Sequence, residues 1–301
     1  MPKVSIIIPT YNYRKYVRNA INSVLEQSFR DFEIIVVDDG STDDTKDIIQ
    51  ERYAPEVRYY YQENKGPGAA RNLGLKYTRG EYIVFLDADD LFLPQNLETK
   101  ITLLDEKPGI SWAFSDVIFQ DESGELMQRG SDYFHSVYYG NDFPPDDLFF
   151  SLLKNGNFIS TASLIARREC FDKLSHFDED LKMHQDYFQW LKLAKNFSTY
   201  YYIDVPLVAI RRHQKSWGNY MQVSFEQRLK LYNKLENLYS SELKKFSKLW
   251  NKKFADVYNQ LGIIEIACGH NKKALIYFMQ SIKKCPFQKF AYFHLLWNLL
   301  K

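Results

Sequence analysis

The sequence has few cysteines, no long apolar run and little net charge. Its three cysteines, Cys170, Cys268 and Cys285, lie far apart among 301 residues with no C-x-x-C pair. We therefore expect reduced thiols rather than a disulfide framework or a zinc site. No apolar stretch approaches the roughly 20 residues that a membrane-spanning helix needs, and the start of the chain lacks a signal-peptide pattern. A cytosolic protein is expected.

The net charge of +1 hides an uneven distribution. From Tyr220 to Lys301 there are 14 Lys and Arg residues against 5 Asp and Glu, whereas the first 219 residues hold 25 against 33. A basic, aromatic tail favours peripheral contact with an anionic membrane, here its inner face, or with an acidic partner. Nucleic acid is not expected as a partner, because no zinc finger, RNP or helix-turn-helix pattern accompanies the charge.

Short apolar runs alternate with helical patterns through residues 1–219. Strands are predicted at Val4–Ile8, Glu33–Val37, Val57–Tyr61, Tyr82–Leu86, Ser111–Phe119, Asn157–Arg167 and Ile203–Ile210. This alternation predicts an α/β fold, in which helices cover a mostly parallel sheet. The glycine-rich phosphate turn of dinucleotide-binding folds is absent after the first strand, where Thr10-Tyr11-Asn12 stands instead.

The fourth apolar run ends in acid, Asp87-Ala88-Asp89-Asp90. Because side chains alternate along an extended backbone, Asp87 and Asp89 would point the same way at the carboxyl edge of the sheet, where open α/β sheets bind ligands. Carboxylate oxygens suit Mg²⁺ or Mn²⁺, and such ions usually complete their shells with substrate phosphates. The pattern therefore predicts a metal-bridged diphosphate. A solvated pair of turn acids is the alternative.

The stretch Asn64–Gly74 is dense in small residues, which let backbone approach a ligand closely. Pro67 suits the first turn of a helix, and Arg71 would stand on that helix. The alternative is a close-packed turn that carries a surface arginine.

Five motifs, in order, resemble those of family 2 glycosyltransferases with the GT-A fold. They are Val4–Asn12, Val36–Asp43, Gly68–Gly74, Gly80–Ile83 and Phe85–Asp90, and the agreement extends over about the first 215 residues. The resemblance implies an inverting enzyme of the hexosyltransferase class, which takes a sugar from a nucleotide diphosphate sugar, usually a UDP-sugar.

The resemblance also implies how the nucleotide is held. Thr10 and Tyr11 would line the base pocket, and Asp39 would accept a hydrogen bond from the uracil N–H. Arg71 would contact the base or a diphosphate oxygen, since its guanidinium offers a planar set of donors. Asp38 is the rival of its neighbour, but a helix cap or a surface acid is its preferred interpretation.

The implied metal site contains Mn²⁺ or Mg²⁺. Asp89 would ligate the ion directly, and Asp87 would reach the ribose or a metal-bound water. Asp90 is again a rival, for which a cap or a surface acid is preferred. A basic loop from Arg211 resembles the family's mobile loop over the diphosphate, in which His213 would be a metal ligand or a donor to the leaving group; a solvated loop is the alternative.

Asp186 opens a helical pattern. A lone acid at this point is most simply a favourable charge at a helix N-terminus, but the resemblance makes it the general base. Gln185 replaces the more usual glutamate before it. His184 is a competing base or ligand, for which a structural role is the commoner one.

The acceptor is less defined. The resemblance places acceptor-facing segments in Gln120–Asn157, and a glycan or lipid-linked acceptor in cell-surface polysaccharide synthesis fits the basic tail. A DxD phosphatase with Asp87 as nucleophile and a noncatalytic nucleotide-sugar-binding scaffold are the other function classes.

Residues 220–301 are predicted to form an α-helical domain. One tetratricopeptide-like repeat at about 255–288 is indicated by Tyr258, Leu261, Gly262, Gly269, Ala274, Phe278 and Pro286. A single repeat cannot bury its own face, so it should pack on neighbouring helices or on a final helix, His294–Leu300. Association of the chain into a homo-oligomer is left open by the sequence.

Overall fold

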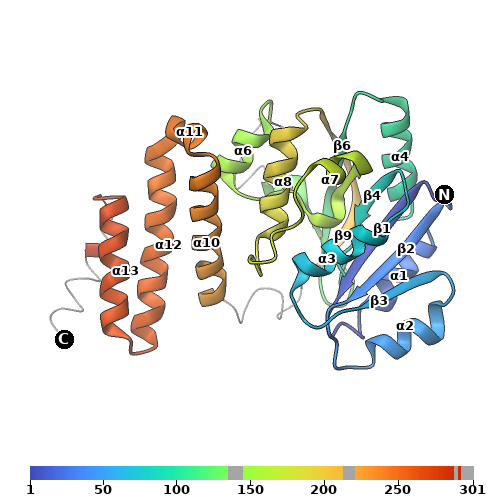
Figure 1. Cartoon of the computed structure of the whole chain (residues 1–301), viewed down its shortest axis with the longest axis horizontal. Coiled ribbons are helices and arrows are strands. Elements are labelled where there is room, and N and C mark those ends of the chain that lie inside the picture. Colours follow the sequence, from blue (N-terminus) through green and yellow to red (C-terminus); the bar gives the residue numbers. More distant parts are fainter. Residues whose placement is uncertain (135–144, 213–220, 288–290, 293–301) are drawn as a thin grey trace. The chain divides into compact units, whose positions relative to one another are not determined.

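The computed structural model describes residues 1–134, 145–212, 221–287 and 291–292 (Figure 1). The chain divides into two compact units, Met1–Ser216 and Trp217–Lys301. The first unit combines a sheet with helices, and the described part of the second is helical. The domain boundary proposed from the sequence, 219/220, falls outside the described residues.

The first unit is built on one sheet. Its strands are β1 (Val4–Thr10), β2 (Phe32–Asp38), β3 (Val57–Tyr61), β4 (Tyr82–Phe85), β5 (Leu91–Phe92), β6 (Trp112–Gln120), β7 (Leu126–Arg129), β8 (Leu164–Arg167) and β9 (Tyr200–Arg211). Their order is β3-β2-β1-β4-β8-β6-β9-β5, with β7 paired to β6. The first four strands are parallel, as predicted. Beyond them the sheet is mixed, because β8 lies antiparallel to both β4 and β6.

Helices cover both faces of the sheet. They are α1 (Val17–Leu25), α2 (Thr45–Tyr53), α3 (Pro67–Tyr77), α4 (Asn96–Glu106), α5 (Gly130–Phe134), α6 (Leu148–Asn155), α7 (Arg168–Lys173) and α8 (Gln185–Asn196). Residues of α1 and α4 share one core with Ile6 and Ile8 of β1. On the other face, the Phe85 ring lies 5.4 Å from the ring of Phe171 in α7 and 6.2 Å from that of Trp190 in α8. The α/β fold is therefore confirmed.

The predicted strand Asn157–Arg167 is wrong over most of its length. Only the last four residues join the sheet, as β8. Before them the chain makes a short 3₁₀ turn, η2 (Thr161–Ser163). The amide and the hydroxyl of Ser163 both donate to the carbonyl oxygen of Ser160, at 3.0 and 2.8 Å. Local hydrogen bonds of this kind compete with the sheet ladder for the backbone.

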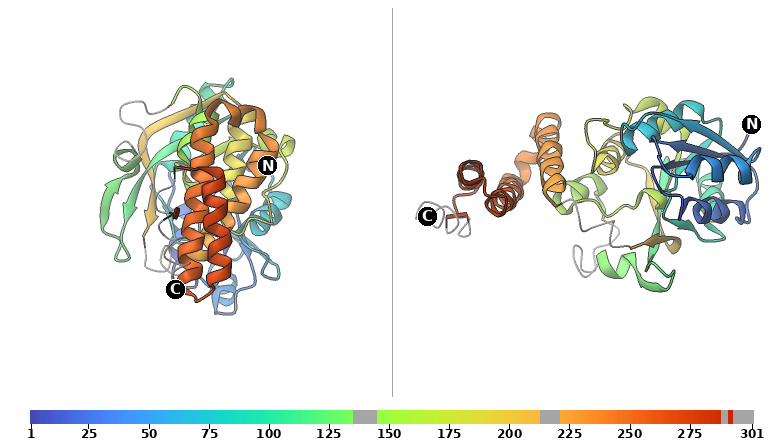
Figure 2. Two further views of the ribbon diagram at one scale, coloured as in Figure 1. Left: turned by 90° about the vertical axis from the view of Figure 1, so that its left-hand side faces the viewer. Right: turned by 90° about the horizontal axis from the view of Figure 1, so that it is seen from below.

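The second unit contains α10 (Met221–Leu238), α11 (Ser240–Leu243), η3 (Lys244–Phe246), α12 (Ser247–Ala267) and α13 (Asn271–Lys284). Helices α12 and α13 pack side by side as a hairpin (Figure 2). The helical prediction is confirmed, whereas the repeat assignment stays a prediction, and His294–Leu300 lies outside the described residues. In the part of the chain that the structure describes, no helix is long and apolar enough to cross a bilayer.

Replacing Gly262 with Ala should destabilise this hairpin. A Cβ on Gly262 would lie 2.5 Å from Cε1 of Phe278, which is fully buried. Overpacking of this kind typically costs about 1–3 kcal/mol, which thermal unfolding of the full chain can measure. Gly109→Ala is the control, since a Cβ there meets nothing within 4 Å. Equal melting temperatures for the two variants would contradict the packing.

Candidate active site

Asp39, just beyond the end of β2, holds the loop that leads into α3. Its Oδ1 accepts hydrogen bonds from Gln62 Nε2 (2.6 Å) and the Lys65 amide (2.9 Å). Its Oδ2 accepts from the Gly66 amide at 2.7 Å. An ionised carboxylate has about four lone-pair sites, so these three bonds leave room for about one more donor. Asp39 is thus both fixed by the fold and able to accept a bond from a ligand.

Asp38 is neither a surface acid nor a helix cap, contrary to the interpretation preferred from the sequence. It is buried, accepting from the Ser41 amide and the Tyr59 hydroxyl, each at 2.7 Å. The helix that follows instead has Asp44 at its N-cap. Asp38 therefore ties the β2–α2 turn to β3.

Thr10 and Tyr11 lie at the carboxyl end of β1, beside Asp39. The amide of Asp39 donates to the Thr10 carbonyl oxygen at 2.8 Å. Thr10 is buried and its Oγ1 has no hydrogen-bond partner among the described residues, whereas Tyr11 is 44% exposed. Because an unsatisfied buried hydroxyl is costly, a ligand atom that bonds to Thr10 would be stabilised there.

Arg71 is buried, not a surface residue. It stands on α3 with 4% of its surface exposed, and its Nη2 donates to Asp87 Oδ1 at 2.5 Å. Its Nε and Nη1 have no partner within the described residues. A buried guanidinium with two unused donor nitrogens fits an anionic oxygen such as that of a diphosphate.

The carboxylates of the acidic motif lie in a turn after β4 rather than on the strand itself. Strand β4 ends at Phe85, and the chain then turns, with the Asp90 amide donating to the Asp87 carbonyl oxygen at 3.0 Å. The alternation argument for Asp87 and Asp89 therefore does not apply. Asp87 pairs with Arg71. The hydroxyl of Tyr13 donates a hydrogen bond to the Asp89 carboxylate, and burial together with the charge of Asp89 raises the pKa of Tyr13.

Asp90 is buried rather than exposed, which corrects the sequence interpretation. Its Oδ1 accepts from the Arg211 amide at 3.1 Å. Burial, and next the charges of Asp89 and Asp87, raise the pKa of Asp90. Arg211 itself is the last residue of β9, and its Nε donates to the Asp89 carbonyl oxygen at 3.2 Å. The predicted ligand His213 lies outside the described residues.

The carboxylate oxygens of this turn fit a divalent cation that also binds oxygens from outside the chain. The described residues contain no cluster of three or more His, Cys, Asp and Glu side chains able to hold a metal ion on their own. Burial is the main cause of the raised pKa of Asp90, and the nearby charges of Asp89 and Asp87 add to it; a cation would offset that negative charge. Mg²⁺ is usually bound by one or two carboxylates plus substrate phosphates, and Asp89 would be the protein ligand.

Asp186 lies in the first turn of α8, half-buried. Its Oδ2 accepts hydrogen bonds from Asn157 Nδ2 (3.3 Å) and Thr161 Oγ1 (3.4 Å). We call these two donors the carboxylate clamp. The structure gives no hydrogen bond to Oδ1 from any described residue, so that oxygen is the one left to accept a proton. The clamp was missed from the sequence, because its members are separated from Asp186 by 29 and 25 positions.

Helix α3 joins the acidic turn to the segment before Asp186. Near its start, a Cβ on Gly68 would lie 3.3 Å from the Asp178 carbonyl oxygen and 3.5 Å from Gln185 Cγ. One turn on, Asn72 exchanges two hydrogen bonds with the backbone of Phe177, at 2.8 and 3.0 Å. Since Arg71 on the same helix pairs with Asp87, α3 links the acidic turn to the segment that leads into α8.

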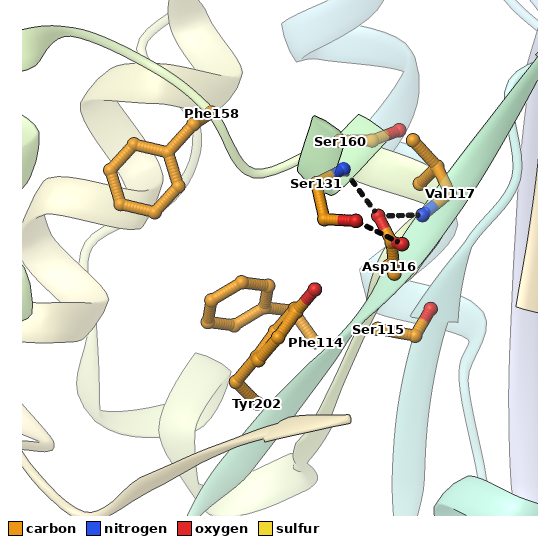
Figure 3. Close-up of a pocket in the computed structure, with 8 residues that line it drawn as sticks. All are labelled: Phe114, Ser115, Asp116, Val117, Ser131, Phe158, Ser160 and Tyr202. Carbon is orange, nitrogen blue, oxygen red and sulfur yellow. Dashed lines mark hydrogen bonds between the residues drawn. The ribbon is translucent and has the colours of Figure 1, made fainter. Parts of the chain in front are cut away.

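A small cavity lies next to the clamp segment, lined in part by Phe158 and Ser160 (Figure 3). Asp116 is fixed on its wall by hydrogen bonds from the amide and hydroxyl of Ser131, each at 2.8 Å, and from Arg129 Nε at 2.8 Å. The cavity has a volume of about 10 Å³, which admits about one water molecule. The cavity is too small for a sugar ring, and its polar network ties β7 and α5 to Asp116 of β6.

The fold is that of GT-A glycosyltransferases. The TarS 1–349 structure of S. aureus aligns with 98% of this chain and 88% of its own, with a TM-score of 0.64 and 20% identity. A mannosyltransferase of Pyrobaculum calidifontis aligns over 100% and 86%, with a TM-score of 0.59 and 17% identity. At these identities the likeness concerns the fold alone.

The sequence comparisons give the family. The sequence model of glycosyl transferase family 2 matches residues 5–175. An uncharacterized glycosyltransferase of Rickettsia typhi is 36% identical over 82% of this chain and 73% of its own length. TuaG of Bacillus subtilis, a glycosyltransferase assigned provisionally to teichuronic acid biosynthesis, is 28% identical over 79% and 90%. The chain therefore belongs to glycosyl transferase family 2 and is a glycosyltransferase, so the phosphatase and scaffold readings are set aside.

Proposed function

We propose that the enzyme transfers a sugar from a UDP-sugar to a hydroxyl of a glycan or lipid-linked acceptor, with inversion at the anomeric carbon and with Mn²⁺ or Mg²⁺ bound. The observation that carries the proposal is the packing of α3: its Arg71 pairs with Asp87, and its Gly68 lies close to Gln185 at the start of the helix that bears Asp186. This packing supports a single site that combines phosphate-binding donors with a free carboxylate oxygen.

The printed descriptions of related proteins support the substrate class. TarS 1–349 has been solved with UDP-GlcNAc and with UDP, and the Pyrobaculum calidifontis mannosyltransferase with GDP-Man and Mn²⁺. The association of TuaG with teichuronic acid supports a role in cell-surface polysaccharide synthesis.

The reaction is a single displacement. Asp186 Oδ1 accepts the proton of the acceptor hydroxyl while that oxygen bonds to the anomeric carbon, and the bond from this carbon to the diphosphate oxygen breaks. Arg71 donates to the departing diphosphate, whose growing charge a divalent ion on Asp89 would also stabilise. Thr10, Tyr11 and Asp39 hold the nucleobase of the donor. No covalent sugar intermediate on the enzyme is required, which parallels inverting glycoside hydrolysis.

The donor proposal is tested by thermal unfolding with UDP, GDP or ADP, each with and without Mn²⁺. A ligand at 100 times its Kd stabilises the native state by about 2.7 kcal/mol, and we expect this shift for UDP with Mn²⁺. Equal shifts with all three nucleotides, or equal UDP shifts with and without the metal, would contradict the proposal.

For the second unit we propose peripheral contact with an anionic membrane. Helix α13 exposes Ile276 and Met279 together with Lys272 and Lys283, a combination that favours an anionic interface. The full chain should sediment with vesicles that contain phosphatidylglycerol and stay in solution with phosphatidylcholine alone. Binding that does not weaken at high salt would contradict an electrostatic contact.

A further inference from the structure

Lys100 of α4 is a fully buried amine. None of its surface is exposed, and its Nζ lies 3.4 Å from the carbonyl oxygen of Ala162 and 5.7 Å from the centroid of the Phe92 ring. Burial alone lowers the pKa of Lys100 to about 7, with no contribution from a charged group. Burying an amine without a carboxylate partner is costly. Stability therefore does not explain a lysine at this position.

The atom that Lys100 contacts belongs to the turn that supports Asp186. Ala162 is the middle residue of η2, and the preceding residue, Thr161, donates to Asp186 Oδ2. The turn is closed on itself by the two bonds from Ser163 to the Ser160 carbonyl oxygen. A constraint on the Ala162 carbonyl therefore also constrains the Thr161 hydroxyl.

We propose that Lys100 is a positioning residue for the general base. By donating to the Ala162 carbonyl oxygen it fixes η2, so that Thr161 holds Asp186 Oδ2 and Oδ1 is presented to the acceptor hydroxyl. This inference rests on the proposed role of Asp186 as base. Because an amine donates a hydrogen bond whether or not it is protonated, the positioning operates on both sides of pH 7.

A double-mutant cycle with Lys100→Met and Thr161→Val tests the path. Each single variant should lower kcat about fivefold, the rate factor that corresponds to one ordinary hydrogen bond, with KM for the donor unchanged. If Lys100 acts through Thr161, the double variant loses no more than Thr161→Val alone. Losses that multiply, to about 25-fold, would overturn the proposal.

Stability gives a second signal with a defined sign. Below pH 7, Lys100 is charged in both the folded and the unfolded chain, and the folded state bears the full cost of burying the charge. Between pH 7 and the ordinary lysine value of 10.5, the unfolded chain binds more protons, so wild-type stability rises with pH. Lys100→Met should therefore be more stable than the wild type at pH 6, and its advantage should shrink towards pH 10.5.

Lys107→Met is the matched control, because it removes an exposed amine just beyond the same helix; it should change neither kcat nor the pH dependence of stability. A Lys100→Met variant less stable than the wild type at pH 6, with unchanged kcat, would show a purely structural lysine. If Lys100→Met does not fold, Lys100→Gln keeps a donor amide and should retain more activity than Thr161→Val; activity below that level would also overturn the proposal.

Asp186→Asn separates the two hypotheses, the base role of Asp186 and the positioning role of Lys100. Full activity of that variant refutes the base. Loss of its activity, together with multiplying losses in the cycle, refutes only the role of Lys100.

Discussion

Asp186→Asn is expected to lower the transfer rate by about 10²–10⁴-fold, the range that general base catalysis typically contributes. The amide has nearly the size of the carboxylate, and its oxygen can still accept from Asn157 and Thr161, so the geometry of the clamp should persist. What is lost is the ability to accept the acceptor's proton. Single-turnover transfer measures the rate, and calorimetry with UDP measures donor binding, which should stay close to the wild-type value.

Asp172→Asn provides the control for this substitution. Asp172 is an exposed aspartate on α7, so the change in charge is the same and the rate should not change. Transfer by the Asp186→Asn variant at more than about a tenth of the wild-type rate would be inconsistent with a base that contributes at least ~10²-fold.

Asp89→Ala is expected to remove the metal dependence of donor binding. A direct ligand should matter at least as much as residues that merely orient ligands, whose loss typically costs about 10–100-fold in metal affinity. UDP affinity in the presence of Mn²⁺ should therefore fall at least about 10-fold, as measured by calorimetry. In the presence of a chelator, the variant and the wild type should bind UDP equally weakly.

Asp89→Asn serves as the companion variant. The amide keeps an oxygen that can accept the hydrogen bond from Tyr13, so it separates metal binding from the packing of the turn. Both variants should lose affinity for UDP with Mn²⁺. Unchanged affinity in Asp89→Ala would remove Asp89 from the metal site, and a loss confined to Asp89→Ala would assign its effect to the contact with Tyr13.

The parallel part of the sheet was predictable because its strands are short, mostly apolar runs separated by helical patterns. The start of α3 at Pro67 was predictable as well, since proline is well suited to the first turn of a helix. The direction of β8 was not, because a strand's orientation depends on the connections around it rather than on its own residues. The extent of the acidic turn depended likewise on where the hydrogen bonds of β4 end.

The sequence proposed individual site residues but not how they are held. Arg71 looked like a residue for the surface or for a ligand, whereas its burial and its pairing with Asp87 follow from the packing of α3 on the sheet. The clamp residues and Lys100 carry no local signal, since they act across long sequence separations. The sequence shows a lysine at position 100 but not its burial, which depends on the tertiary structure.

The bonding of Asp39 bears on how pyrimidines are told apart. With three internal donors on its carboxylate, Asp39 can accept about one further hydrogen bond, from an N–H group of a nucleobase. The imide of uracil supplies such a proton, whereas the ring nitrogen at the same position in cytosine offers only a lone pair. Two electron-rich atoms would then face each other without a hydrogen between them, an arrangement that rejects the analogue strongly. Fidelity towards the nucleobase would thus originate in the same loop that begins α3.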